Sequence, residues 1–323
     1  MAVAVVFTGG TIASRVDSAA GGALPVLRGH EIVAQTPGLA DVATVEPIDW
    51  GLVPASHLGF TEILGLARLI DGLLARPDVD GAVVVQGTDT IEETSFAFDL
   101  LVPSAKPVVV TGAMRTASDP DYDGPRNLTD AVACAAAHEL REQGTLVVLN
   151  GLVIGADVAV KTHATAMDTF QPRDGEPLAR VRDASVEASQ RRQRVVLPAI
   201  PDAAAEPVHL LTASTGMDGT LVRLARATHP RGLVVAAAGT GNTHPDLLAA
   251  AVELIGEGTV LALTTRCAGG RVAPAYAFPG GGATWARAGA LLSALNGPKC
   301  RIALGLGLGA GLSGRALADA LRA

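Results

Sequence analysis

The stretch from Gly81 to Leu101 constrains the fold of this chain most strongly, because three local signals follow one another in it. Ala82 to Val85 is a short apolar run rich in valine, which predicts a strand buried on both faces. The polar segment Gln86-Gly87-Thr88-Asp89 then predicts a turn, and the capping-box spacing of Thr90 and Glu93 predicts that a helix begins there. A strand, a polar turn and a helix N-terminus in this order are typical of open α/β sheets, which bind ligands at the carboxyl ends of their strands.

The N-terminus repeats this layout. Ala2 to Phe7 is an apolar run that predicts a strand, and Thr8-Gly9-Gly10-Thr11-Ile12-Ala13-Ser14 predicts a tight turn. The glycine pair allows the backbone to bend and to approach a ligand closely. One threonine in such a turn usually serves as a helix cap. Two turns that each place a glycine close to a threonine, at Thr11 and at Thr88, favour a functional site.

Strands and helices alternate along the chain, which predicts an α/β fold with two domains. We expect a larger N-terminal domain with a doubly wound, mostly parallel sheet at residues 1–183, and a smaller C-terminal α/β domain at residues 207–323. The length of 323 residues exceeds the size at which one hydrophobic core keeps growing, which supports this division. Residues 184–206 are polar and carry several prolines, and we interpret them as a linker. Residues 15–28 are expected to form an irregular loop, either a plain surface connection or a lid over the Thr11 turn.

The composition, with 49% hydrophobic and 18% charged residues, is that of a well-buried globular protein. The net charge of −7 offers no basic face, so we expect no nucleic-acid partner. The densest basic cluster, Arg191 to Arg194, is interpreted as a solvated loop. The N-terminus lacks the basic region of a signal peptide, and no apolar run reaches the roughly 18 residues of a membrane span. We therefore expect a soluble cytoplasmic protein without a membrane partner.

The sequence offers no motif for a metal or a cofactor, and we expect neither. Cys134, Cys267 and Cys300 are far apart and are interpreted as buried small hydrophobic residues rather than disulfide or metal partners. The seven histidines form no zinc-binding motif, and a phosphate-binding P-loop is absent. Gly309, Gly311 and Gly314 have GxGxxG spacing, but the chain ends before the acidic residue expected about 20 positions on. We interpret these glycines as positions in loops or in close packing.

Hydroxyl groups and one carboxylate remain as candidates at strand ends: Thr11, Ser56, Thr88 and Asp89, with Lys161 beyond a later strand. A threonine hydroxyl needs a base or a route for its proton before it acts as a nucleophile. Thr88, Asp89 and Lys161 are suited to such a relay, with Lys161 accepting the proton through Thr88. A solvated surface lysine is the alternative interpretation of Lys161.

Backbone N–H groups at Thr88 and Ala113 are suited to stabilising an oxyanion. Together these groups predict acyl transfer on a small polar molecule, as in an amidohydrolase that uses neither a metal nor a cofactor.

Several segments resemble, in the right order, the bacterial-type L-asparaginase (asparaginase/glutaminase) family. Thr8 to Ala13 and Gln86 to Thr94 resemble its two signature segments, and this pair is highly specific. Lys106 to Arg115, Asp123 to Leu128 and the surroundings of Lys161 also match. The matches cover most of residues 1–170, whereas the C-terminal third matches weakly, mainly at residues 238–242.

The resemblance implies hydrolysis of L-asparagine to L-aspartate and ammonia through a covalent acyl-enzyme on Thr11. Thr88 would be the second catalytic threonine, with Asp89 and Lys161 as its partners. The resemblance also assigns four substrate-binding positions. Ser56 would bind the α-carboxylate and Asp89 the α-amino group. Gly87 and Ala113 would complete the site, and Ala113 would donate its backbone N–H to the oxyanion. The family is typically a homotetramer with sites between subunits, so we expect a homo-oligomer, either a dimer or a tetramer.

Three departures from the family pattern keep alternatives open. The loop at Gly21 to Leu27 lacks the tyrosine that the family usually places near the nucleophile, and the two tyrosines of the chain lie elsewhere in the sequence. Gln86 stands where a histidine is frequent, and His244, with Asn242 nearby, stands where an asparagine is usual. The alternatives are an amidase that prefers L-glutamine or another small amide, and a catalytically weak sensor that binds asparagine or aspartate.

Overall fold

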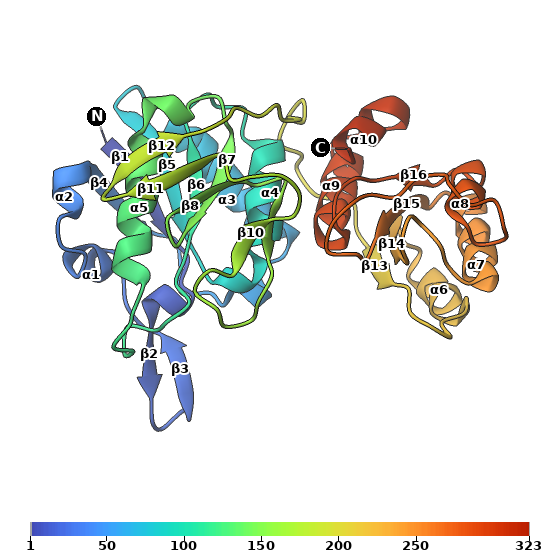
Figure 1. Ribbon diagram of the computed structural model, residues 1–323, viewed down its shortest axis with the longest axis horizontal. Helices are drawn as coiled ribbons and strands as arrows, with labels where there is room; N and C mark the ends of the chain where they lie inside the picture. Colours follow the sequence, from blue (N-terminus) through green and yellow to red (C-terminus); the bar gives the residue numbers. More distant parts are fainter. Residues whose placement is uncertain (1, 323) are drawn as a thin grey trace. The chain divides into compact units, whose positions relative to one another are not determined.

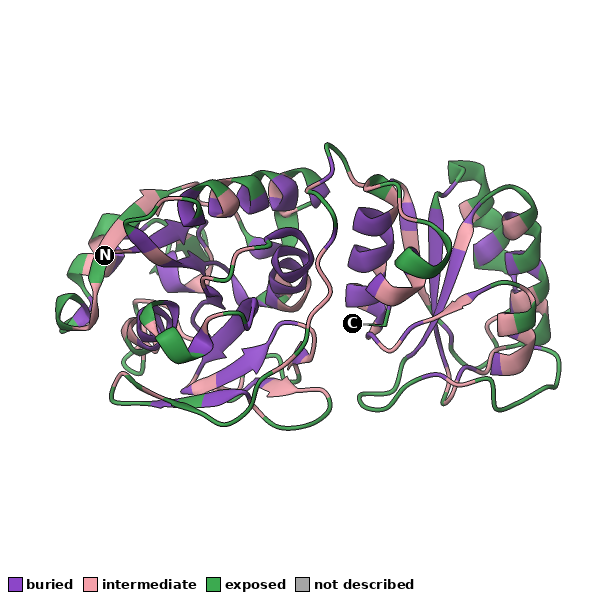
Figure 2. Ribbon diagram, turned by 90° about the horizontal axis from the view of Figure 1, so that it is seen from above, coloured by how far each residue is buried: buried purple, intermediate pink, exposed green. Residues whose placement is uncertain are grey.

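The computed structural model describes residues 2–322, which fold into two compact units that divide between Arg194 and Val195 (Figures 1 and 2). Each unit is a sheet covered by helices, with buried residues concentrated on the strands and on the inner faces of the helices. Within residues 2–322, no helix combines the length and the apolar character needed to cross a membrane.

The first unit is built on an eight-stranded sheet in the order β12-β11-β8-β7-β6-β5-β1-β4. Five neighbouring strands are parallel, as expected: β4 (Thr44–Asp49), β1 (Ala2–Phe7), β5 (Val79–Val85), β6 (Val108–Thr111) and β7 (Thr145–Leu149). Three antiparallel strands extend it: β8 (Leu152–Gly155), β11 (Ala179–Arg182) and β12 (Ser185–Ala188). A separate pair is formed by β9 (Ala159–Lys161) and β10 (Phe170–Pro172).

Helices cover both faces of this sheet, which confirms the doubly wound architecture. Alternate strand residues such as Val5 and Val83 share one core with α1 (Gly29–Ala34), α2 (Leu39–Val42) and α5 (Gly124–Ala136). The strand residues between them are equally buried, and α3 (Phe60–Leu74) and α4 (Ile91–Leu101) pack on that side. Burial on both faces explains the valine-rich strands.

The strand order reverses between β1 and β5. The chain passes from β1 to β4 on one side and then returns to β5 on the other side of β1. In an open α/β sheet, such a reversal opens a crevice at the carboxyl ends of the two strands. The two threonine-containing turns follow β1 and β5, so both lie at this crevice.

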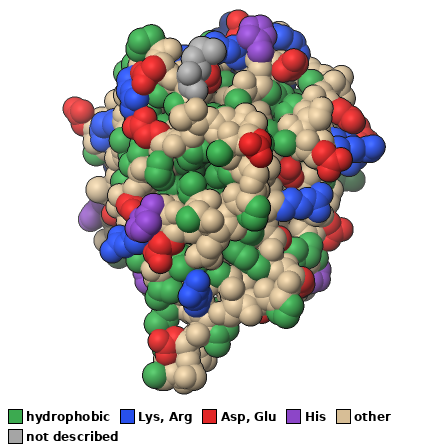
Figure 3. Space-filling model, turned by 90° about the vertical axis from the view of Figure 1, so that its left-hand side faces the viewer, with side chains coloured by type: hydrophobic (Ala, Val, Ile, Leu, Met, Phe, Trp, Pro, Cys, Tyr) green, Lys and Arg blue, Asp and Glu red, His purple; other side chains and the backbone are tan. Residues whose placement is uncertain are grey.

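Residues 15–28, expected to be an irregular loop, mostly form a β-hairpin instead. Its strands are β2 (Ser14–Asp17) and β3 (Gly22–Pro25). The carboxylate of Asp17 accepts hydrogen bonds from the N–H groups of Ala19 and Ala20, which closes the turn. The hairpin projects from the sheet (Figures 1 and 3) and leaves Val16 exposed. Figure 3 also shows hydrophobic side chains gathered on the same side of the first unit, among charged ones.

The expected side-chain cap of α4 is not formed. The Thr90 hydroxyl donates to the carbonyl of Ala55 at 3.1 Å, and the N-cap makes no side-chain hydrogen bond. The Thr90 side chain therefore links its own turn to the segment of Ala55. As a cap, it would instead have accepted a hydrogen bond from a backbone N–H of α4.

The first part of the segment expected to be a linker packs against the first unit. Residues 185–188 form β12, and Arg192 lies against the buried Asp99, with Nη1 3.0 Å from Oδ2 and Nη2 2.5 Å from Oδ1. Arg192 also bonds Asp157 at 2.9 Å, and Arg194 donates to the carbonyl of Asp99. The interpretation of the arginine cluster as a solvated loop is wrong for these two side chains, because a buried carboxylate requires a positively charged partner.

Replacing Arg192 with methionine is expected to lower the free energy of unfolding by about 3–5 kcal/mol, because Asp99 stays buried without its main partner. Burial already raises the pKa of Asp99. Urea unfolding at pH 7.5 measures the change. Arg191→Met is the matched control, because Arg191 is exposed and should cost less than about 0.5 kcal/mol. Equal losses in both variants would contradict a structural role for Arg192.

The second unit contains a four-stranded parallel sheet of β13 (Val208–Thr212), β14 (Gly232–Ala237), β15 (Val260–Thr265) and β16 (Leu291–Leu292). Its helices are α6 (Thr220–Ala225), α7 (Pro245–Gly256), α8 (Gly282–Arg287), α9 (Gly297–Gly309) and α10 (Gly314–Ala320). Gly309 ends one helix and Gly314 begins the next, so the GxGxxG spacing does not follow a strand. A Cβ at Gly309 would lie 2.4 Å from the carbonyl oxygen of Ala203, which confirms close packing there. A Cβ at Gly311 or Gly314 would meet no atom within 4 Å, so these two glycines are not close-packed.

The cysteines differ from expectation at one position. Cys134 and Cys300 are buried, as predicted, whereas Cys267 is exposed. Burial raises the pKa of the Cys300 thiol to about 12, so it remains a neutral thiol. Cys267 follows β15 in a glycine-rich segment whose backbone lies at the surface, which explains the wrong prediction.

Candidate active site

The two threonine-containing turns pack directly against each other at the crevice. A side chain on Gly10 would overlap the backbone of Gly87, and φ of +86° at Gly10 also favours glycine. A Cβ on Gly87 would lie 2.9 Å from the Cβ of Ala55. Three segments, the turn after β1, the turn after β5 and the short helix η2 (Ala55–His57), therefore converge within backbone contact.

Thr11 begins a short 3₁₀ helix, η1 (Thr11–Ala13), and is half-buried. The carbonyl of Gly10 accepts hydrogen bonds from the Ala13 N–H at 3.0 Å and from the Ser14 hydroxyl at 2.8 Å. These contacts hold the backbone on both sides of Thr11, so the turn fixes the point from which its side chain extends.

Lys161 joins Thr88 and Asp89 in one cluster. Its Nζ donates to Thr88 Oγ1 at 2.9 Å and to Asp89 Oδ1 at 2.7 Å. Thr88 is buried, and the side chain of Lys161 is 14% exposed, whereas that of Asp89 is 75% exposed. Lys161 is the last residue of β9, which contacts α4, and the start of α4 follows the Thr88 turn. The side-chain nitrogen of Lys161 therefore lies between a shielded hydroxyl and an accessible carboxylate, which excludes the interpretation of Lys161 as a solvated surface lysine.

Ala113 lies two residues after the end of β6, and its neighbour Gly112 contacts the Thr88 turn. A Cβ on the preceding residue, Gly112, would lie 2.5 Å from the Gln86 carbonyl oxygen and 3.1 Å from Thr88 Cγ2. Asn127 donates to the Gly112 carbonyl at 3.0 Å, which fixes this turn.

Ser56 is exposed in η2, directly after Ala55, and so faces solvent next to the Gly87 turn. Gln86 is fully buried, and its side-chain oxygen accepts the Thr94 hydroxyl at 2.9 Å. Within residues 2–322, no group of three or more His, Cys, Asp or Glu side chains is arranged to hold a metal ion.

Comparison with known proteins identifies the family. Residues 2–194 match the family model described as "Asparaginase, N-terminal", and residues 207–321 match "Glutaminase/Asparaginase C-terminal domain". The chain belongs to the asparaginase family.

Similarity to individual asparaginases extends over at least 90% of the chain. A "Probable L-asparaginase" of Deinococcus radiodurans is 36% identical over 94% of this chain and 91% of that protein. An "L-asparaginase" of Bacillus licheniformis is 28% identical over 90% of this chain and 89% of its own length. The crystal structure of a "Probable Cytoplasmic L-asparaginase" from Campylobacter jejuni superposes with a TM-score of 0.88 at 27% identity, over 100% of this chain and 99% of that chain.

Sequence reasoning missed three residues that shape this asparaginase-family site. Asp123 accepts hydrogen bonds from the N–H groups of Met114 at 3.0 Å and Arg115 at 2.9 Å, and it also accepts one from Asn127. Tyr122 donates to the Ile12 carbonyl at 2.7 Å, beside Thr11. The sequence could have indicated Asp123 and Asn127, because both lie in the segment Asp123 to Leu128, which resembles the family.

Tyr122 therefore lies next to the first turn, although it is distant from that turn in the sequence. Burial raises the pKa of Tyr122 well above its usual value, and the nearby carboxylate of Asp123 adds to this rise. The phenol remains neutral and acts as a hydrogen-bond donor. Glycine is needed at position 124, because a side chain there would overlap the ring of Tyr122.

The second unit has its own small cavity, of about 260 Å³, near the ends of β13, β14 and β15. His244 and Asn242 line it, together with Arg266. The ring of His244 accepts the Asp246 N–H at 3.2 Å and caps α7, so its Nδ1 serves the fold. The side-chain oxygen of Asn242 is buried and has no hydrogen-bond partner within the described residues.

Proposed function

We propose that this protein is an L-asparaginase that converts L-asparagine and water to L-aspartate and ammonia. The observation that carries the proposal is the Lys161–Thr88–Asp89 cluster, which lies in the turn that packs against the Gly10–Thr11 turn. Family membership and the names of the relatives support the same reaction.

The proposed reaction has two steps on Thr11. In the first, Thr11 Oγ1 bonds to the side-chain carbonyl carbon of asparagine, the C–N bond breaks, and the hydroxyl proton passes to the departing nitrogen, which leaves as ammonia. In the second, water attacks the resulting ester, and its proton passes through Thr88 toward Lys161 before it returns to Thr11. Aspartate is then released. The N–H groups of Thr88 and Ala113 are proposed to stabilise the oxyanion in both steps.

Substrate binding is proposed to involve Asp89 and Ser56. The exposed carboxylate of Asp89 is available to the α-ammonium group, and the exposed hydroxyl of Ser56 to the α-carboxylate. Gly87 precedes Asp89 by two positions and packs against Ala55, the residue before Ser56, so the two proposed binding groups belong to neighbouring turns. No step of the proposed reaction draws on a metal or a cofactor.

Assembly and location are proposed from the family. We infer a homo-oligomer, a dimer or a tetramer, in which a neighbouring subunit contributes residues of its second unit, with Asn242 and His244 as candidates. We also infer a cytoplasmic protein, because the similar Campylobacter jejuni protein carries that description.

A related amide is the second candidate substrate, because the C-terminal family model covers glutaminases as well as asparaginases. Ammonia release from L-asparagine, L-glutamine and other small amides, measured side by side, tests both candidates. Fast release from asparagine supports the main proposal, and faster release from glutamine supports the second. Saturable binding of asparagine or aspartate without release from any amide would indicate a sensor.

Tyr122→Phe is expected to lower kcat about 5–10-fold with little change in KM, because loss of one hydrogen bond of about 1 kcal/mol loosens the Thr11 turn. Steady-state kinetics with asparagine measure both constants. Tyr276→Phe is the control, because Tyr276 is half-exposed in the second unit and packs on Phe278. An unchanged kcat in Tyr122→Phe would show that the hydroxyl does not position the turn.

A further inference from the structure

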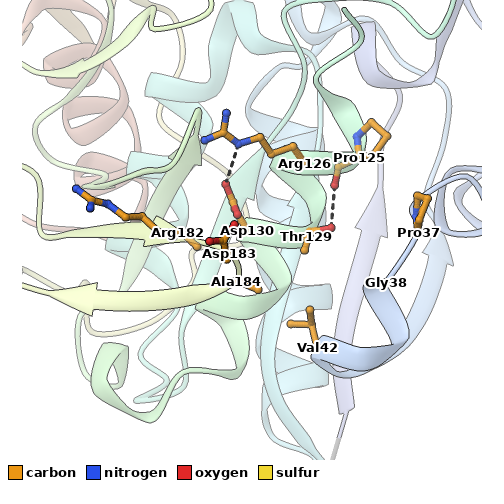
Figure 4. A pocket seen from close by; sticks show the side chains of 11 residues that line it. Pro37, Gly38, Val42, Pro125, Arg126, Thr129, Asp130, Arg182, Asp183 and Ala184 are labelled. Carbon is orange, nitrogen blue, oxygen red and sulfur yellow. Dashed lines mark hydrogen bonds and ion pairs between the residues drawn. The ribbon is translucent and has the colours of Figure 1, made fainter.

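A cavity of about 670 Å³ lies in the first unit, apart from the residues proposed for catalysis. Its floor is the outer face of α5, at residues 125–130. Its walls are residues 37–42, which include α2, and the turn between β11 and β12, at residues 181–184 (Figure 4). Its volume falls within the range of about 300–1,000 Å³ typical of small-molecule sites.

Asp130 on the floor of this cavity is only 5% exposed, and its Oδ2 has no hydrogen-bond partner within the described residues. The nearest cation is Arg126, whose Nε lies 3.9 Å from that oxygen, beyond hydrogen-bond distance. Arg126 itself is 64% exposed, so this ion pair offsets little of the cost of burial. A buried carboxylate normally accepts hydrogen bonds, so Asp130 lacks a donor.

The fold keeps this carboxylate in place from two sides. Leu128 and Ala131 of α5 pack into the sheet core, which fixes the rotation of the helix and leaves Asp130 beside the β11–β12 turn. Asp183 and Ala184 in that turn adopt left-handed conformations, with φ of 51° and 59°. Figure 4 shows Asp183 next to Asp130, with Arg126 on the other side.

Charges of both signs line the cavity. Arg126 and Arg182 are exposed at its rim, together with Asp183, and Asp130 is at its floor. Pro37 and Val42 supply apolar surface between them. A complementary molecule would therefore carry a hydrogen-bond-donating cation at one end and an anion at the other.

We propose that this cavity binds a small zwitterion, whose ammonium group donates to Asp130 and whose carboxylate meets Arg126 or Arg182. A free amino acid and a short peptide share this chemistry. The proposal is independent of the function proposed above, because none of the residues assigned to catalysis lines the cavity.

Titration calorimetry of the full-length protein at pH 8 tests the proposal with two zwitterions, γ-aminobutyrate and glycylglycine, which distinguish a free amino acid from a peptide. Ethylamine and butyrate, each with a single charge, are the reference ligands. Saturable binding of at least one zwitterion, at least about 10-fold tighter than either reference, is expected. Absence of binding by both zwitterions, or equal binding of ethylamine, overturns the proposal.

Variants locate the binding. Asp130→Asn is expected to weaken zwitterion binding at least about 10-fold, and Arg182→Gln by about 3–10-fold, because each removes one charged partner. Asp71→Asn on α3 is the matched control and should leave binding unchanged. Binding that persists unaltered in Asp130→Asn would place the ligand elsewhere and overturn the proposal.

Thermal unfolding shows whether Asp130→Asn is folded, and it tests whether the buried carboxylate of Asp130 destabilises the wild type. Burial raises the pKa of Asp130 to about 6. The positive charge of Arg126 opposes this rise, and the negative charge of Asp183 adds to it. Cys134, one turn further along α5, is the other titratable neighbour, and burial keeps it a neutral thiol. A raised pKa of a carboxyl group destabilises the fold above that pKa, and this cost decreases as the pH falls from that pKa to the ordinary value near 4.

Asp130→Asn is therefore expected to raise Tm by about 2–4 °C at pH 8 and to leave it unchanged near pH 4. The same protonation should weaken zwitterion binding to the wild type between pH 8 and pH 5. A lower Tm for the variant at pH 8 would show that Asp130 already has a stabilising partner, and the proposal would then fail.

Discussion

Replacement of Thr11 by valine is expected to lower kcat for asparagine hydrolysis by at least about 10⁴-fold, because the proposed acyl-enzyme cannot form without a hydroxyl. Valine is nearly isosteric with threonine, and the neighbouring hydrogen bonds that hold the turn involve the backbone of Gly10, the hydroxyl of Ser14 and the carbonyl of Ile12. The fold should therefore persist, with a Tm within a few degrees of the wild type. Ammonia release and thermal unfolding measure the two quantities.

Thr44→Val is the matched control, because Thr44 is an exposed residue at the start of β4 in the same unit. It should retain wild-type kcat. Mass spectrometry of the wild type after rapid acid quenching should show a covalent adduct with asparagine, and Thr11→Val should show none. Near wild-type turnover by Thr11→Val would remove Thr11 as the nucleophile.

Replacement of Lys161 by methionine is expected to lower kcat by about 10²–10⁴-fold, because general acid–base catalysis contributes on that scale. Methionine has a similar length and fills the space of the lysine stem, so Thr88 keeps its packing but loses the Nζ contact of 2.9 Å. KM should change by less than about 10-fold, because Lys161 contacts Thr88 and Asp89 and is not assigned to substrate binding. Steady-state kinetics separate the two constants.

Lys106→Met is the matched control for this variant. Lys106 Nζ donates to the carbonyls of Leu74 at 2.8 Å and Arg76 at 2.6 Å, in a half-buried position outside the site. Its loss should lower stability and leave kcat unchanged. An effect of Lys161→Met confined to KM, or an equal fall of kcat in both variants, would refute the proton relay.

The α/β fold was predictable because its signals are local. The parallel strands are short runs of β-branched residues, and Ala82 to Val85 is buried because both sheet faces are covered. The turns after β1 and β5 were found from glycine next to threonine. Their contact, through Gly10 and Gly87, depends on strand order, which no local pattern reveals.

Errors arose where a distant partner decides the environment of a residue. The arginines at positions 192 and 194 looked solvated because the carboxylate that they neutralise, that of Asp99, lies more than 90 residues away in the sequence. Tyr122 reaches Ile12 across 110 residues. The hairpin at residues 14–25 has few strand-forming residues and depends on backbone pairing and the Asp17 turn.

The candidate site was predictable only in part. Thr88 and Asp89 are adjacent in the sequence, and the structure brings Lys161 to both. Ser56 and Ala113 lie in turns that contact the Gly87 and Thr88 region, so the geometry admits the expected assignments. The catalytic and binding roles remain predictions. The cavity at Asp130 had no sequence signal, because one aspartate on a helix is ordinary until its burial is known.

The attachment of Arg192 and Arg194 to Asp99 has a consequence for how much of the chain can fold alone. A fragment that stops at residue 183 contains every parallel strand of the first sheet, yet it would bury Asp99 without a counter-charge. A fragment that continues to residue 194 supplies both guanidinium groups from its own C-terminal end. The need to neutralise Asp99 therefore defines the smallest fragment of the first unit that should fold alone. This fragment ends at Arg194, some 45 residues beyond Leu149, the end of the last parallel strand.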